Sequence, residues 1–180
     1  MNHTRKRQWL APGQAPIPEP KADLHPKKVM LSVWWDYKGI IWHEVLPTGT
    51  TITGELYSTQ LERVAREHRT KRPEQQKVLL LHDNARPHVA KVVSRKIEQL
   101  GWQVLPHPPY SPDLAPTDYH LFRSLSNYLR GKQFDDLNEL KSSINTFFYS
   151  KTPEFYASGI NQLRDRWASV IDSEGEYIID

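Results

Sequence analysis

Two aspartates stand at positions where the predicted elements can hold a side chain in place. Asp83 closes the short apolar run 78–81, which is typical of a strand buried on both faces. Asp118 follows a proline-rich loop and Thr117, a favourable N-cap, just before a helical pattern of apolar residues. Because a strand tip and a helix start are both rigid, the two carboxylates can face one point, as a hard divalent cation requires.

Paired carboxylates in an α/β domain suit two-metal phosphodiester chemistry. One ion activates water or a 3′-hydroxyl and the other stabilises the leaving oxygen, with the ions roughly 3.5–4 Å apart. Each ion needs several oxygen ligands, so a third acidic residue is expected. Spacing alone leaves a second interpretation open, in which Asp83 forms a turn at the strand end and Asp118 only complements the helix dipole.

The composition limits the class of protein. The chain has 180 residues and 21.0 kDa, the size of one domain with a real core. A net charge of +3 permits a polyanionic partner without requiring one. The absence of cysteine excludes disulfides and thiolate metal sites and fits a reducing intracellular compartment. No long apolar run exists, so neither a membrane span nor a signal peptide is expected.

The first 26 residues differ from the rest. They carry five of the 14 prolines and a basic cluster formed by Arg5, Lys6 and Arg7, with little apolar content. This composition predicts an extended arm, residues 1–26, that becomes ordered on a partner surface. A flexible tail is the alternative.

The remaining residues alternate between strand and helix patterns. They predict a β-hairpin from 29–35 and 40–46, a helix from about Thr53, strands at 78–81 and 102–105 with a helix between them that Gly101 closes, and helices at 118–130, 137–149 and 153–171. Thr152 and Pro153 form a cap and first-turn pair, and 177–179 is a candidate edge strand. The two strands around Gly101 should be parallel, with a right-handed crossover. The basic side of the first helix is either a solvated face or a DNA site.

The loop 106–116 decides where Asp118 lies. It holds five prolines in eleven residues, so it is neither helix nor inner strand and should be stiff. Asp113 in this loop is the competing candidate for the second carboxylate. The spacing and the helix start favour Asp118, and Asp113 is expected to shape the turn after Pro112.

Two long motifs add a resemblance. Segments 81–88 (LHDNARPH) and 107–122 (HPPYSPDLAPTDYHLF) closely resemble the central motifs of the mariner branch of the Tc/mariner DNA transposases. Thirty-four residues lie between Asp83 and Asp118, the spacing of the second and third catalytic aspartates in mariner enzymes. Segments 33–36 and 155–160 also look like mariner, so the resemblance covers essentially the whole chain.

The resemblance implies a fold, a site and partners. The expected fold is α/β and RNase H-like, with a mixed sheet over residues 27–180 and a clamp-loop-like arm before it. Asp83 and Asp118 would be catalytic and would bind Mg²⁺ or Mn²⁺. The implied partners are transposon-end and target DNA and a second copy of the chain, and the implied location is the nucleus. The residues expected to contact DNA are Arg5, Lys6, Arg7, Arg86 and His88.

The sequence also departs from the family pattern. Mariner enzymes carry their first catalytic Asp on a strand shortly before the segment that resembles residues 7–10 here, and a helix-turn-helix region before that. We therefore expect an RNase H-like domain without its first strand, inactive in DNA cleavage by itself. Neither Asp36 nor Glu44 matches the absent motif.

Two other functions were weighed. A domesticated or decayed remnant would keep DNA or protein contacts without chemistry. A zinc protein using His82, His88, His107 and His120 is disfavoured, because no pair of these residues has tight metal-ligand spacing.

Overall fold

A computed structural model describes residues 13–14 and 29–178 of the chain. The predicted arm, with Arg5, Lys6 and Arg7, lies outside the described residues apart from positions 13–14. Within the described residues, no helix is long and apolar enough to cross a membrane.

The predicted hairpin is confirmed. Strand β1 (Leu31–Asp36) pairs antiparallel with β2 (Gly39–Val45), and the register shifts between Trp34 and Trp35. Valine, isoleucine and tryptophan dominate both strands, and such side chains pack well on a pleated surface. The shift leaves Ile41 of β2 without a partner residue on β1, as in a β-bulge.

The strand-helix-strand unit is also confirmed. Strands β3 (Leu79–Leu80) and β4 (Gln103–Val104) are parallel neighbours, each shorter than predicted. Helix α2 (Lys91–Leu100) connects them and ends at Gly101, whose φ of 67° is the left-handed conformation of a helix C-cap. Helix α1 (Gly54–Lys71) begins where the Thr53 side chain accepts a hydrogen bond from the Leu56 amide.

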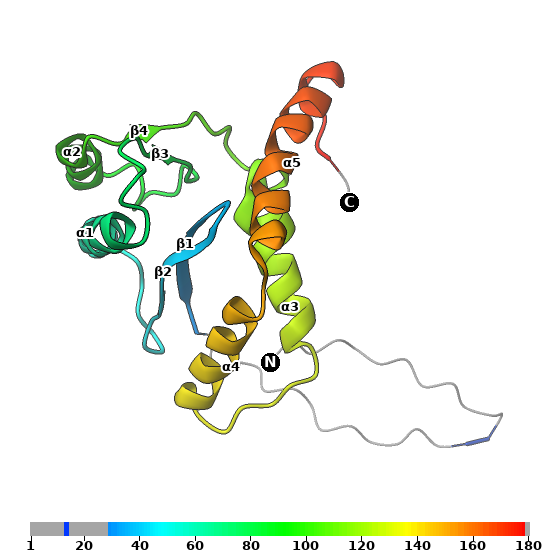
Figure 1. Cartoon of the computed structure of the whole chain (residues 1–180). Coiled ribbons are helices and arrows are strands. Elements are labelled where there is room, and N and C mark those ends of the chain that lie inside the picture. Colours follow the sequence, from blue (N-terminus) through cyan, green and yellow to red (C-terminus); the bar gives the residue numbers. More distant parts are fainter. Residues whose placement is uncertain (1–12, 15–28, 179–180) are drawn as a thin grey trace.

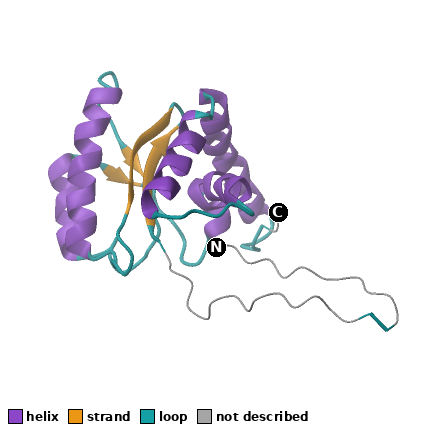
Figure 2. Cartoon of the chain, turned by 90° about the horizontal axis from the view of Figure 1, so that it is seen from below, coloured by secondary structure: helices purple, strands orange, loops and turns teal. Residues whose placement is uncertain are grey.

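The elements form three layers (Figures 1 and 2). Helices α1 and α2 cover one side of the strands. The other side is covered by α3 (Arg123–Leu129), α4 (Leu137–Tyr149) and α5 (Pro153–Asp172). Thr152 is the N-cap of α5 and Pro153 lies in its first turn, as predicted.

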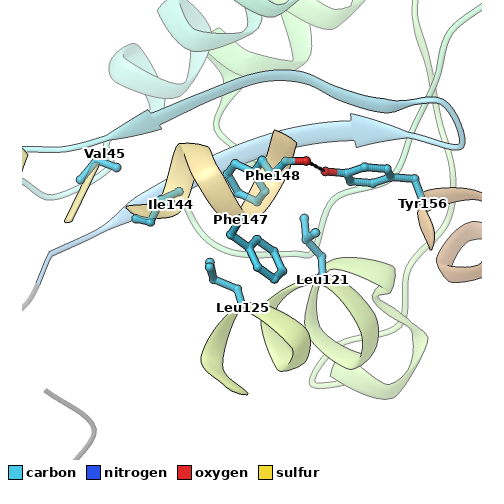
Figure 3. Close-up of a cluster of buried hydrophobic side chains, with 7 residues drawn as sticks. All are labelled: Val45, Leu121, Leu125, Ile144, Phe147, Phe148 and Tyr156. Atoms are coloured by element: carbon cyan, nitrogen blue, oxygen red, sulfur yellow. Dashed lines mark hydrogen bonds between the residues drawn. The ribbon is translucent and has the colours of Figure 1, made fainter. Parts of the chain in front are cut away.

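Each helical layer has its own core. The larger core joins β2 to the C-terminal helices through the seven residues of Figure 3, where the Tyr156 hydroxyl donates to the Phe148 carbonyl at 2.9 Å. The smaller core packs α1 and α2 against β3 through Tyr57, Leu61, Leu80, Val93 and Ile97. Burial of these apolar side chains is the main term that holds the helices on the strands.

The strands do not form one continuous sheet. Among the described residues, hydrogen bonds join β1 only to β2 and β3 only to β4. The expected mixed sheet is therefore present as an antiparallel pair and a parallel pair. Both β1 and β3 line the cavity described below.

Two local predictions are wrong. Thr117 is not an N-cap: Pro116 holds that position, and Thr117 begins a π-helix, η2 (Thr117–Phe122), that continues into α3. Its hydroxyl instead accepts a hydrogen bond from the Trp35 indole at 3.0 Å. Residues 177–178 form no strand, and the Ile178 amide donates to the Asp113 carboxylate.

Candidate active site

Asp83 lies just beyond the end of β3 with its side chain mostly exposed. Its Oδ1 accepts two hydrogen bonds, from the Ala85 amide at 3.0 Å and from Nδ1 of His88 at 2.6 Å. Burial acts to raise the pKa of Asp83, but these partners outweigh it, so the pKa lies below its ordinary value. The carboxylate is therefore charged at neutral pH.

Asp118 is the second residue of η2 and is accessible to solvent. The residues on either side of it are anchored to other elements. Thr117 bonds to Trp35 on β1, and the Tyr119 hydroxyl donates to the Gly159 carbonyl of α5 at 2.8 Å. π-helical turns are rare and are frequently found at functional sites.

The two carboxylates converge on one cavity of about 860 Å³, which residues of β1 and β3 line together with Asp83 and Asp118. The pKa of Asp118 is raised, first by desolvation and next by the negative charge of Asp83. The Asp83 carboxylate is thus close enough to Asp118 for its charge to act on the Asp118 pKa. A cation between them would relieve this repulsion, so the site fits a divalent metal ion.

A cluster of three rings packs beside Asp83, and one of them, His88, is bonded to it. Tyr57 of α1 is buried, and its hydroxyl forms a hydrogen bond with Nδ1 of His82 at 3.1 Å. The His88 ring packs against Tyr57, with centroids 4.2 Å apart, and stacks on His82 at 5.3 Å. Desolvation lowers the pKa of His82 to about 4, so this imidazole is neutral at physiological pH. In the sequence, Tyr57 lies on the apolar face of the first helix. This position predicts a core residue but does not indicate contact with His82 or His88.

A side-chain bond ties together the two segments that leave β3 and β4. The Asn84 amide donates to the His107 carbonyl at 2.7 Å. The His107 ring lines the cavity, and its Nδ1 is buried without a hydrogen-bond partner among the described residues. Its position at the start of the proline loop was visible in the sequence, but nothing there showed that it faces the carboxylates.

The other acidic candidates have different partners. The Asp36 carboxylate accepts two hydrogen bonds from Arg72, one from Nε at 2.8 Å and one from Nη2 at 2.9 Å. The Glu44 carboxylate accepts hydrogen bonds from Gln60 and Arg63. Asp113 is buried and binds the Ile178 amide. None of these carboxylates is therefore available as a third ligand.

The described residues hold no group of three histidine, cysteine, aspartate or glutamate side chains that could bind a metal ion. Asp83 and Asp118 would thus supply two oxygen ligands, and others must come from water, substrate or another segment. Three of the four imidazoles of the zinc alternative have other partners: His82 bonds to Tyr57, His88 to Asp83 and His120 to the Phe155 carbonyl. Of the residues expected to contact DNA, Arg86 is exposed near Asp83 and His88 is half-buried.

Paired carboxylates that converge on one cavity are a feature shared with metal-dependent enzymes, among them those that act on phosphodiesters. The comparisons with known proteins define the class further. A profile described as Transposase (partial DDE domain) matches residues 1–78.

Two curated relatives match nearly the whole chain. Histone-lysine N-methyltransferase SETMAR of Homo sapiens is 44% identical over 179 residues, which are 98% of this chain and 26% of that protein. Mariner Mos1 transposase of Drosophila mauritiana is 42% identical over 178 residues, 97% of this chain and 52% of Mos1. The chain spans about half the length of Mos1 and about a quarter of SETMAR.

A solved structure agrees with the sequence relatives. The crystal structure of the catalytic domain of Mos1 mariner transposase has a TM-score of 0.83 and 44% identity, and the match covers 87% of this chain and 78% of that domain. The chain belongs to the mariner transposase family, and its fold is that of the catalytic domain.

Proposed function

We propose that the chain carries the catalytic centre of a mariner transposase, which cleaves and joins DNA by metal-dependent phosphodiester transfer. The observation that carries the proposal is the convergence of Asp83 and Asp118 on one cavity, where the negative charge of Asp83 helps to raise the pKa of Asp118. The two residues come from separate elements, and their spacing is the mariner spacing. If Asp83 only formed a turn and Asp118 only complemented the helix dipole, the two carboxylates would not need to lie on the same cavity.

Asp83 and Asp118 would hold Mg²⁺ or Mn²⁺. When bound, such an ion activates the attacking oxygen and stabilises the leaving one. Asp83 and Asp118 both line the cavity and are exposed, so a DNA phosphate can approach them. Mos1 catalytic domain structures with raltegravir include one with Mg and one with Mn, which supports the same metals here.

The cavity itself supports a more specific proposal. It lies between two strands that make no hydrogen bonds to each other, and its walls are mostly apolar side chains of those strands. We propose that an additional strand fills this space, pairs with β1 and β3, and brings a third carboxylate beside Asp83. This strand would complete the RNase H-like sheet and the metal ligands together.

DNA is the proposed substrate. Arg86 is exposed beside Asp83, and the cluster of Arg5, Lys6 and Arg7 would add sequence-independent contacts to phosphates. Mos1 structures include a paired-end complex with the left transposon end, which supports transposon-end DNA and a homodimer as partners. The resemblance to mariner transposases supports the nucleus as the proposed site of activity.

The test is a cleavage assay with labelled inverted-repeat DNA and Mg²⁺ or Mn²⁺. Two proteins are compared: this chain, and the chain fused to an upstream strand bearing the third carboxylate together with a DNA-binding region. We expect nicking by the fused form only, abolished by Asp118→Ala. Metal-dependent nicking that survives Asp118→Ala would refute the assignment of the site.

One observation favours a second function. The described residues supply only two carboxylates at the site, as in a domesticated remnant that binds DNA or protein without chemistry. In that case the fused form would bind the labelled DNA but leave it intact with either metal. The same assay therefore separates the two functions.

A further inference from the structure

We propose that His88 is a positioning residue that fixes Asp83 as a one-oxygen ligand of the metal. This inference rests on the proposed function. Two donors, Nδ1 of His88 and the Ala85 amide, bind the same oxygen, Oδ1 of Asp83, at 2.6 and 3.0 Å. The bonds hold the plane of the carboxylate and leave Oδ2 to face a cation.

The His88 ring is held as firmly as the carboxylate that it orients. It packs on buried Tyr57, with ring centroids 4.2 Å apart, and it stacks on His82, whose ring is nearly parallel to it at an interplanar angle of 9°. The Tyr57 hydroxyl fixes His82 in turn, and the His88 amide donates to the Ala85 carbonyl at 2.8 Å. A chain of contacts thus runs from α1 to one oxygen of Asp83.

Positioning explains the arrangement better than stability does. Asp83 is 59% exposed on its side chain, and an ion pair at such a surface contributes little to folding. A ligand whose second oxygen is already bonded loses less freedom when it binds a metal, and such outer partners commonly change metal affinity 10–100-fold. The bond also commits Nδ1, so any contact of His88 with DNA must use Nε2.

The donor atom allows a discriminating substitution. The amide nitrogen of asparagine stands at the same number of bonds from Cβ as Nδ1 of histidine, whereas that of glutamine matches Nε2. Because the bond to Asp83 uses Nδ1, His88→Asn should preserve it and His88→Gln should not. A role in packing against Tyr57 alone would make the two substitutions similarly harmful.

The experiment measures Mn²⁺ affinity of the whole chain by electron paramagnetic resonance, without DNA. We expect His88→Ala and His88→Gln to weaken Mn²⁺ binding about tenfold and His88→Asn to restore most of it. The matched control is His43→Asn, the same chemical change on β2, outside the residues that line the cavity. Thermal melting of each variant establishes that it is folded.

Nitrogen NMR of the histidine side chains provides the second readout. In the parent protein His88 should carry its proton on Nδ1, and Asp83→Ala should shift that resonance strongly. Mn²⁺ binding that depends on Asp83 but is equal in His88→Ala and the parent would overturn the inference alone. Mn²⁺ binding that is unchanged in Asp83→Ala would overturn the proposed function as well.

Discussion

Asp83 and Asp118 differ in the direction in which their surroundings move the pKa. Hydrogen bonds to Asp83 stabilise its charge, whereas Asp118 is desolvated and faces the charge of Asp83. The surroundings of Asp83 therefore stabilise its charged form, whereas those of Asp118 disfavour the charged form unless a cation is nearby. This asymmetry is expected where carboxylates are placed for function, because stability alone would separate them.

Replacing Asp118 tests this electrostatic cost. A carboxyl whose pKa is raised in the folded state destabilises the fold once the pH exceeds its ordinary value. Asp118→Asn should therefore melt above the parent at pH 7, and the difference should vanish as the pH falls below about 4, where the parent carboxyl is also neutral. Differential scanning calorimetry across this range is the measurement.

Added Mg²⁺ supplies the control for the same variant. The parent should gain thermal stability from the metal, because binding to the native state shifts unfolding, while Asp118→Asn should gain less. An Asp118→Asn variant that melts below the parent at every pH would mean that the carboxylate is stabilised by its surroundings, contrary to the raised pKa.

Among single residues, the sequence predicted the two aspartates but not the residues that contact or anchor them. Asp83 and Asp118 stand in long motifs with a fixed spacing, so the local sequence was enough to predict that both carboxylates lie at one place. Tyr57 and His107 lie far from Asp83 along the chain, and only tertiary packing brings them to it. The bond from Trp35 to Thr117 was missed for the same reason, and it replaced the N-cap that local sequence favoured.

Helix η2 owes its position to contacts with β1 and α5. Gly159 of α5 lies against this helix, and a Cβ added there would stand 2.4 Å from Cδ2 of His120 and 3.0 Å from the Trp35 ring. The Gly159 carbonyl also accepts the Tyr119 hydroxyl. Close approach of α5 at this one residue thus sets where the turn that carries Asp118 lies.

Gly159→Ala should therefore destabilise the protein although alanine favours helix. The propensity gain is about 1 kcal/mol, whereas forcing two packed rings to move costs about 1–3 kcal/mol or more. We expect a net loss in free energy of unfolding, measured by urea denaturation, and weaker Mg²⁺ binding because Asp118 moves. Asn161→Ala, on the exposed face of the same helix, is the control and should change stability by less than about 0.5 kcal/mol. Equal or greater stability of Gly159→Ala would show that the rings adjust freely.

Element types were predicted well because their apolar periods are strong. The hairpin, the strand-helix-strand unit and all long helices lie where the patterns placed them. The π-helical turn was not predictable, because i→i+5 bonding leaves no periodic signal within six residues. The edge strand predicted at 177–179 is absent over the described residues 177–178, where the Asp113 carboxylate, brought near by the fold, binds the Ile178 amide that a strand partner would use.

The cavity between β1 and β3 is a feature of the whole molecule, because no single residue or element accounts for it. Both β1 and β3 present an edge to the cavity of about 860 Å³, between helical layers that pack well on the rest of the strands. Unpaired strand edges with apolar neighbours attract other strands. Sequence could indicate the strands but not the space between them, because strand order depends on the complete fold.

This cavity predicts the behaviour of the chain in solution. Val33, Trp35, Leu81 and Leu105 line it, so a dye that fluoresces on apolar surfaces should bind the folded chain and the chain should tend to associate. Fusing an upstream strand should suppress both effects, because the strand fills the space and pairs with β1 and β3. The matched control carries proline in the middle of the fused strand, which removes a ladder donor and should leave dye binding high. A monomeric chain that melts cooperatively without dye binding would mean that the cavity is closed in solution, and the proposed position of the third carboxylate between β1 and β3 would then be wrong.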